Sequence, residues 1–176
     1  MCGIIGYAGS RKASEVITDG LKRLEYRGYD SVGLAIRNPG GVDLRKDKGP
    51  IETVSALLQF TGIEGNMGIG HTRWATHGSV CKENSHPHSD CSGKIVIVHN
   101  GVVENYLKLR KSLSEKGHLF ISQTDSEVIA HLIEEHSKND PLPLAFRKAI
   151  AELEGSYAVA MISTIVMDLS KVRYQR

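Results

Sequence analysis

Segments of strand length and segments of helical spacing follow one another along the chain without strict alternation. Short apolar segments predict strands over residues 2–8, 31–37, 67–72, 94–99 and 156–162, with a polar strand over 42–46 after a turn at 38–41. Apolar residues three or four positions apart predict helices over about 13–25, 51–58, 103–116 and 142–153, and another that starts at 124–127. Because the strands are short and do not alternate with helices, the pattern favours an α+β layered fold over a doubly wound parallel sheet.

The 176 residues are enough for one domain with a real core. The formal charge of +2 is spread along the sequence, which gives no electrostatic footprint for nucleic acid. The apolar run at 95–98 is far too short to span a bilayer, and charged residues interrupt any signal-peptide core near the N-terminus. The three cysteines are an odd number, which argues against a disulfide framework and fits a reducing compartment. We therefore expect a cytoplasmic protein with no membrane partner.

Cys2 is the first candidate for catalysis. Methionine before a small residue is usually removed, and removal of Met1 would leave a thiol and a free α-amino group on the same residue. A free thiol has a reference pKa of about 8.5 and an α-amino group one of about 7.7–8.0, so the amine can take the proton of the thiol at neutral pH. The alternative is an ordinary buried cysteine on a terminal strand, since cysteine is among the most buried residue types.

Two further clusters carry groups that could bind a small polar ligand. The run from His71 to Gly78 holds two imidazoles, a guanidinium and the only tryptophan of the chain. Its Arg73 could grip a carboxylate with two hydrogen bonds and Trp74 could cover the ligand, although a packed surface loop would also explain the run. The segment Arg27–Asp30 predicts either a tight turn with a functional arginine or a helix exit with a salt-bridged one.

The last two candidates lie near the predicted strand 94–99 and the helix that follows. His99, Asn100 and Gly101 come at the predicted end of that strand, where an asparagine amide and a glycine N–H could stabilise an oxyanion. A plain Asn-Gly turn is the other reading. Asp125 is predicted in the first turn of a helix, where the helix dipole favours a carboxylate in any protein. Together with Arg73, Asp125 could recognise the α-amino and α-carboxylate groups of an amino acid.

A metal site and a nucleotide site are the alternatives to this interpretation. Cys81, His86, His88 and Cys91 lie within eleven residues, but structural zinc sites usually pair their ligands across a longer loop. We therefore expect no metal and no cofactor. Gly65, Gly68 and Gly70 have the wrong spacing for a dinucleotide fold, and the sequence lacks the Gly-Lys-Ser/Thr of a P-loop.

Taken in order, the motifs resemble those of the class II glutamine amidotransferases, whose glutaminase domains are N-terminal-nucleophile hydrolases. Within that family they look most like the glutaminase domains of the glutamine–fructose-6-phosphate aminotransferases, also called glucosamine-6-phosphate synthases. The resemblance covers about residues 2–162. It rests on the segments Met1–Ile4, Arg23–Ser31, His71–Gly78, His86–His88, His99–Gly101 and Thr124–Glu127.

The resemblance implies a four-layer αββα sandwich and a role for each candidate residue. Cys2 would be the nucleophile and its amine the base, with Asn100 and Gly101 as the oxyanion hole. Arg73 and Asp125 would clamp glutamine, and Trp74 would gate the path of ammonia. The remaining residues expected to line the pocket are Arg27, Thr76 and His77. The family's His-Pro-His loop binds no metal, which further weakens the zinc alternative.

The resemblance also implies partners. L-glutamine would be the substrate, and fructose 6-phosphate would be reached only through a sugar isomerase domain that this sequence does not contain. A family-like homodimer is allowed, and the expected activity is the glutaminase half of hexosamine synthesis.

The match ends before the chain does. Residues 163–176 have no counterpart that we recognise, and the family's domain continues with further strands. We therefore expect a C-terminally truncated sandwich over residues 2–162 with an unmatched tail over 163–176. An inactive fragment that binds glutamine or another chain is the alternative function, because missing strands would expose sheet edges.

Overall fold

The computed structural model describes residues 2–75 and 78–165. It contains seven strands, five α-helices and two short 3₁₀ helices within that part of the chain. The elements are β1 Gly3–Ala8, α1 Ala13–Leu24, η1 Glu25–Arg27, β2 Ser31–Asn38, β3 Gly41–Lys48, α2 Ile51–Leu57, η2 Phe60–Gly62, β4 Met67–Arg73, β5 His88–Ser89, β6 Ile95–Val103, α3 Tyr106–Glu115, α4 Glu127–Ser137, α5 Leu142–Ala151 and β7 Gly155–Ser163.

The first sheet has four antiparallel strands in the order β1-β4-β2-β3. Strand β2 turns into β3 at Asn38–Gly41, where the turn was predicted. Helices α1 and α2 cover one face of this sheet, because Val32, Leu34 and Ile36 alternate along β2 and pack against them.

The second sheet has three antiparallel strands in the order β5-β6-β7. Ile95 and Ile97 on β6 point into a core formed with α3, α4 and α5. Val96 and Val98, on the opposite face of the strand, pack against Ala35 and the first sheet.

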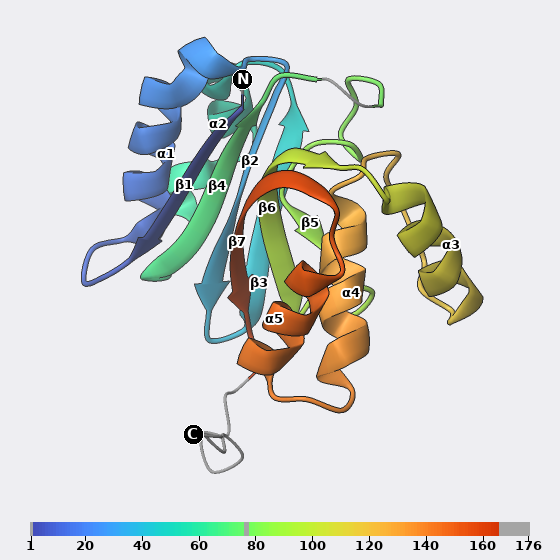
Figure 1. Cartoon of the computed structure of the whole chain (residues 1–176). Coiled ribbons are helices and arrows are strands. Elements are labelled where there is room, and N and C mark those ends of the chain that lie inside the picture. The colour runs from blue at the N-terminus through green and yellow to red at the C-terminus, as the bar shows by residue number, and fades with distance from the viewer. Residues whose placement is uncertain (1, 76–77, 166–176) are drawn as a thin grey trace.

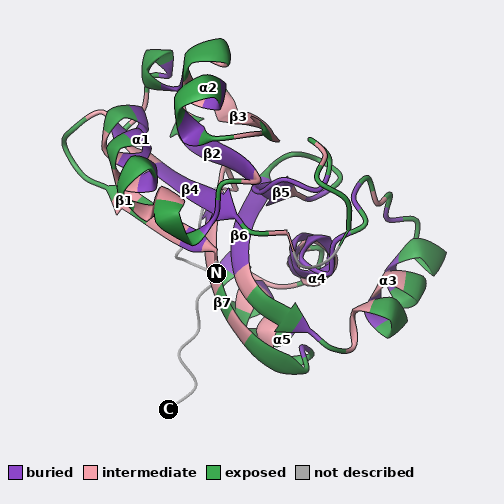
Figure 2. Ribbon diagram, turned by 90° about the horizontal axis from the view of Figure 1, so that it is seen from above, coloured by how far each residue is buried: buried purple, intermediate pink, exposed green. Residues whose placement is uncertain are grey.

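The two sheets therefore face one another, with helices outside each of them. Figure 1 shows α1 and α2 on one side and α4 and α5 on the other, and Figure 2 shows the buried strands between them. The prediction of an α+β sandwich with αββα layers is confirmed. No helix of the described ranges is long and apolar enough to cross a membrane.

Strand β6 is longer than predicted. His99–Gly101 lies within the strand and not at its end, because β7 pairs with β6 from Ile95 to Val103. Helix α3 consequently starts at Tyr106 instead of 103, and it ends before Gly117 as predicted. The extension of β6 depends on its pairing with β7, which begins about fifty residues further along the chain, so local sequence pattern could not reveal it.

Helix α4 was predicted to start at 124–127, and it starts at the last of these residues. The carboxylate of Glu127 accepts hydrogen bonds from the N–H groups of Ile121 and Ser122, at 2.9 and 2.8 Å. The side chain of Ser126, at the N-cap, makes no capping bond. Asp125 therefore precedes α4 and does not lie in its first turn.

Candidate active site

Cys2 is brought to the site by the pairing of β1 with β4. In the register of that pair Gly3 lies opposite Thr72, so Cys2 is carried to the end of β4. The backbone N–H of Trp74 donates to Cys2 Sγ at 3.2 Å, and the Trp74 carbonyl lies 3.5 Å from the same sulfur. The half-buried thiol is thus held against the segment that follows β4.

The Arg27–Asp30 segment positions the chain beyond β4. A Cβ atom at Gly28 would lie 2.7 Å from the carbonyl carbon of Arg73, so only glycine allows this close approach. Asp30 accepts a hydrogen bond from the N–H of Ala75 at 2.8 Å, and its own N–H donates to the Arg73 carbonyl at 3.1 Å. Both contacts fix the backbone on which Arg73 and its neighbours are mounted. The sequence did not predict this role for Asp30.

Asn100 reaches Cys2 from the second sheet. Its Nδ2 donates to the Cys2 carbonyl at 3.2 Å, which links β6 to the start of β1. A primary amide has two N–H donors, so one of them remains for a ligand. Gly101 has φ +128°, and a Cβ atom there would lie 2.0 Å from the Ser156 carbonyl oxygen. Glycine is therefore required where β6 passes the candidate nucleophile.

His71 determines which way the Asn100 amide points. Its Nε2 lies 2.9 Å from Asn100 Oδ1 and 3.1 Å from the His99 carbonyl. Both partners are acceptors, so Nε2 must carry the proton. Burial lowers the pKa of His71 to about 4, and the ring is neutral near pH 7. With Oδ1 held by His71, the amide nitrogen of Asn100 is turned toward Cys2.

Arg73 and Asp125 lie at the same cavity as Cys2, and both are buried. Burial lowers the pKa of Arg73 from its usual value, but arginine stays charged at neutral pH. One oxygen of Asp125, Oδ2, accepts the backbone N–H of Val103 at 2.8 Å. The carboxylate therefore anchors the end of β6 as well as lining the cavity.

A small cavity is shared by most of the predicted site residues. It is lined by Cys2, Arg73, Trp74, His86, His99, Asn100, Gly101, Thr124, Asp125 and Ser126. Trp74 is 44% exposed, and its ring meets that of Tyr29 edge-on with the ring centroids 5.5 Å apart. The structure thus gathers Cys2, Asn100 and Gly101 with Arg73, Trp74 and Asp125, which come from four separate stretches of sequence.

One predicted pocket residue, Arg27, does not line this cavity. Arg27 ends η1 and is exposed, and its Nε donates to the Tyr26 hydroxyl at 3.1 Å. Its role in ligand binding stays a prediction. Thr76 and His77 lie outside the described residues.

A stack of buried histidines lies behind the site. His71 and His86 are stacked with centroids 4.1 Å apart, and His86 meets His88 edge-on at 4.5 Å. Burial, followed by the charge of neighbouring histidines, lowers the pKa of His86 well below its usual value. Among the described residues, Cys81, His86, His88 and Cys91 do not form a shared metal cluster, so the zinc set weighed from the sequence is not assembled.

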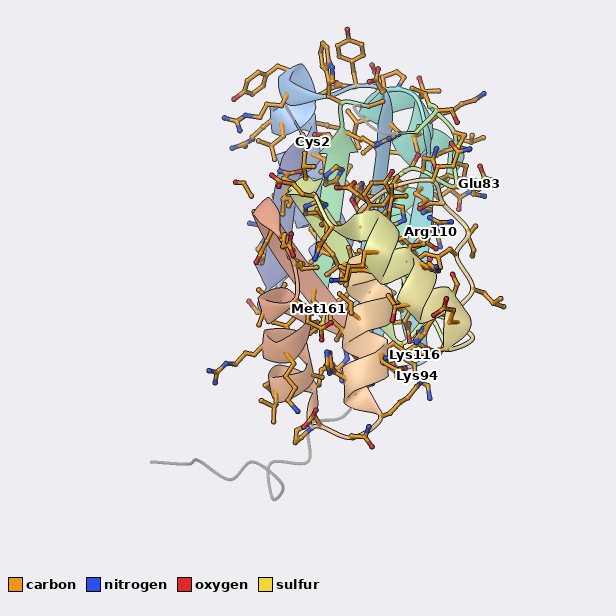
Figure 3. All side chains as sticks on the ribbon, turned by 45° about the vertical axis from the view of Figure 1, so that its right-hand side comes forward. Cys2, Glu83, Lys94, Arg110, Lys116 and Met161 are labelled. Atoms are coloured by element: carbon orange, nitrogen blue, oxygen red, sulfur yellow. The ribbon has the colours of Figure 1, made fainter. Side chains whose placement is uncertain are left out.

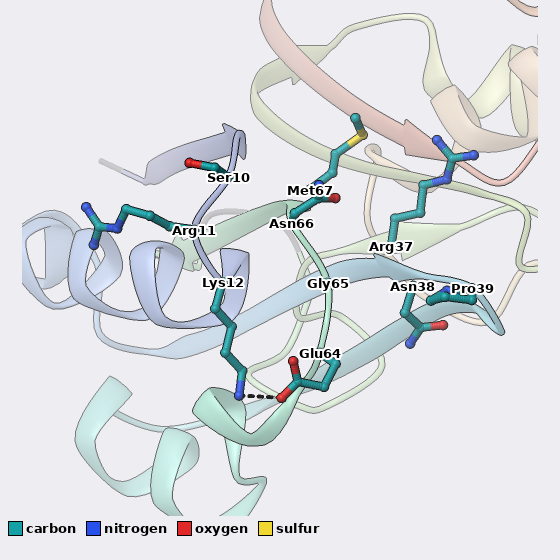
Figure 4. Close-up of a pocket in the computed structure, with 10 residues that line it drawn as sticks. All are labelled: Ser10, Arg11, Lys12, Arg37, Asn38, Pro39, Glu64, Gly65, Asn66 and Met67. Carbon is teal, nitrogen blue, oxygen red and sulfur yellow. Dashed lines mark ion pairs between the residues drawn. The ribbon is translucent and has the colours of Figure 1, made fainter.

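A wider hollow lies away from Cys2, between the start of α1 and the β2–β3 turn. Figure 4 shows it crossed by the ion pair of Lys12 and Glu64, at 2.7 Å. Its lining contains none of the predicted site residues.

Curated relatives are similar to almost the whole of this chain. A glutamine–fructose-6-phosphate aminotransferase (isomerizing) of Thermococcus kodakarensis is 56% identical over 92% of the chain, and one of Pyrococcus horikoshii is 54% identical over the same share. The match spans only 27% of the length of each relative.

Solved structures agree with the fold. A glutamine phosphoribosylpyrophosphate amidotransferase from B. subtilis superposes with a TM-score of 0.80 at 28% identity, over 93% of this chain and 35% of its own. The family model described as a glutamine amidotransferase domain matches residues 71–173, which is more than half of the chain. The sandwich fold and these similarities agree, and the chain belongs to the glutamine amidotransferase family.

Proposed function

We propose that this chain hydrolyses L-glutamine to glutamate and ammonia. The observation that carries the proposal is the convergence of a cysteine, an oriented asparagine amide, an arginine and an aspartate on one cavity. The cysteine supplies a nucleophile, and the two charged groups match the α-carboxylate and α-amino groups of an amino acid.

In the proposed reaction the α-amino group of Cys2, freed by loss of Met1, takes the proton of the thiol. The thiolate then attacks the carbonyl carbon of the glutamine side chain, and a C–S bond forms. The second N–H of Asn100, with Gly101, stabilises the negative oxygen of the tetrahedral intermediate. The C–N bond breaks, ammonia leaves with the transferred proton, and water cleaves the thioester to give glutamate and the free thiol.

Ammonia from this step would serve a second reaction in a complete enzyme. The relatives are named for amino transfer to fructose 6-phosphate, and this chain spans about a quarter of their length. We propose that residues 2–162 act as the ammonia-supplying part of such an enzyme, with a homodimer as a family-like assembly.

The direct test is an assay of glutamate and ammonia release from L-glutamine, run on protein whose N-terminus has been read by intact mass. A glutamine analogue with an electrophilic carbon in place of the amide should add to the protein once, and peptide mapping should place the adduct on Cys2. Modification of Cys81 or Cys91 instead, with no release of ammonia, would reject the proposal.

Replacement of Asp125 should weaken recognition of the α-amino group. In Asp125→Asn the amide oxygen can still accept the N–H of Val103, so the end of β6 is retained. The charge facing the ammonium is lost, and affinity for glutamine should fall about 10- to 100-fold. An analogue that lacks the α-amino group should bind almost as it does to the parent.

Arg73→Lys is the companion change for the α-carboxylate. The single ammonium group of lysine cannot reproduce the bidentate hydrogen bonding of a guanidinium, so glutamine should bind more weakly to this variant too. Asp19→Asn, which removes an exposed carboxylate from α1, is the matched control. If both site variants bind glutamine as tightly as this control, the two residues are not the clamp.

Loss of the His71 donor should lower turnover more than binding. In His71→Leu the Asn100 carbonyl loses its partner and the amide can rotate, so kcat should fall by up to about 10²–10³-fold while KM changes little. His71→Gln, which offers an N–H at a similar place, should recover part of the loss. A parent-like kcat for a folded His71→Leu protein would show that Asn100 is oriented without His71.

A further inference from the structure

Four potential metal ligands meet at the end of the second sheet that lies away from Cys2. They are Cys91 in the β5–β6 loop, His118 after α3, and His131 and Glu134 on α4. One ligand atom from each lies within 4.8 Å of all the others. Cys91 and Glu134 are 43 positions apart, which is why sequence spacing did not reveal the group.

Four of the ligand-to-ligand distances fit a tetrahedral cation. Cys91 Sγ lies 3.8 Å from His118 Nδ1 and 3.6 Å from His131 Nδ1. Glu134 Oε2 lies 2.9 and 3.2 Å from the same two nitrogens. Zinc bond lengths of about 2.3 Å to sulfur and 2.0–2.1 Å to nitrogen or oxygen give S···N edges near ~3.6 Å and N···O edges near ~3.3 Å at a tetrahedral angle.

A second carboxylate lies near the Nε2 atom of each histidine, on the side of the ring away from the proposed ion. His118 Nε2 lies 3.0 Å from Glu135 Oε2, and His131 Nε2 lies 3.7 Å from Glu127 Oε1. A cation on Nδ1 leaves the proton on Nε2 for the outer carboxylate, which is the arrangement that metal-bound histidines usually have.

The environment also suits a bound ion. His118 and His131 are buried, and the ring of Phe120 packs edge-on against His131 with centroids 4.5 Å apart. Cys91 is exposed, which gives the ion a path from solvent.

We propose that Cys91, His118, His131 and Glu134 bind one Zn²⁺ ion. The mixed sulfur, nitrogen and oxygen donors favour Zn²⁺ over the hard cations Ca²⁺ and Mg²⁺, which prefer oxygen alone. With four protein ligands the coordination is closed, so the ion is structural and activates no water. It joins the β5–β6 loop and the α3–α4 connection to helix α4.

The zinc site is separate from the catalytic cavity. None of its four ligands lines that cavity. Cys91 lies in the loop just before Ile95, the first residue of β6, whereas Asn100 of the catalytic cavity lies further along the same strand. Ile95 and Asn100 are five residues apart, which is about 17 Å along a strand. Figure 3 shows Cys2 toward one end of the molecule and Lys94 and Lys116, the sequence neighbours of Cys91 and His118, toward the other. The proposal does not rest on glutamine hydrolysis.

Titration of the metal-free, reduced protein with Zn²⁺ tests the proposal. We expect one equivalent to bind, and a rise in Tm of about 5–10 °C once free Zn²⁺ is ~100-fold above Kd. Because only the thiolate of Cys91 can bind the ion, binding should release a proton and tighten with pH. Titration with Co²⁺ should give the visible absorption of a tetrahedral ion and a thiolate-to-metal charge-transfer band.

Paired variants distinguish metal binding at Cys91 from metal binding at the other two cysteines. All are made in a Cys2→Ser background, so that the nucleophile cannot compete for metal. Cys91→Ser should remove the charge-transfer band, while Cys81→Ser, its control, should retain it. Glu135→Gln should weaken Zn²⁺ about 10- to 100-fold by freeing the His118 ring, and the exposed Glu115→Gln should have no effect.

Two results would overturn the proposal. One is the absence of a saturable Zn²⁺ equivalent in the folded protein, which would leave the four residues as an ion-paired network. The other is equal affinity in the Cys91→Ser and Cys81→Ser proteins, which would place the metal elsewhere.

Discussion

Cys2→Ala should abolish glutamine hydrolysis and leave glutamine binding close to that of the parent. The thiol forms the covalent bond, whereas Arg73 and Asp125 are the proposed recognition groups. Loss of a nucleophile should lower kcat by at least about 10⁴-fold. The Trp74 N–H loses its sulfur partner at 3.2 Å, which is a weak contact whose loss should cost little stability.

Steady-state ammonia release and calorimetric binding of glutamine measure the two halves of this prediction. Cys81→Ala is the matched control, because its half-buried thiol does not line the cavity. Turnover by Cys2→Ala near the parent rate would remove the proposed mechanism. Loss of binding along with turnover would make the thiol part of the recognition site.

Retention of Met1 should be almost as damaging as loss of the thiol. When Met1 stays attached, the nitrogen of Cys2 is an amide with no basic lone pair, and no other group is assigned the role of base. The loss should exceed the ~10²–10⁴-fold typical of a proton-transfer catalyst alone, because the added residue also occupies space beside the thiol.

The experiment compares preparations with Met1 present and with Met1 removed by an aminopeptidase, each verified by intact mass. Equal activity would show that the base lies elsewhere. His71 and His99 are then the described candidates, although burial lowers the pKa of both. His77, outside the described residues, would be the third.

Much of the fold could be predicted from local pattern. Alternating or continuous apolar residues located β1, β2 and β4 to within one or two positions, and helical spacing located α1 and α5 similarly well. The misplacements have a common cause. The extension of β6 through Asn100 and the presence of β5 depend on pairing between distant strands, which local periodicity does not record.

The candidate site divides in the same way. Cys2, Asn100 and Asp125 have reactive or charged groups that stand out in a sequence. His71, which orients the Asn100 amide, and Asp30, which holds the backbone after β4, act through hydrogen bonds between separate segments. Their identities alone gave no sign of these roles.

The sequence by itself determined the chemistry that is available and the layered fold that carries it, because residue type and apolar period are local properties of the chain. Tertiary structure decided which groups meet. It turned the Asn100 amide toward Cys2, tied Asp125 to the end of β6, and drew Cys91 to the two histidines and Glu134 in place of the nearer His86 and His88. Hydrogen bonds and metal coordination act over about 3 Å, so chain folding, and not distance along the sequence, selects the partners.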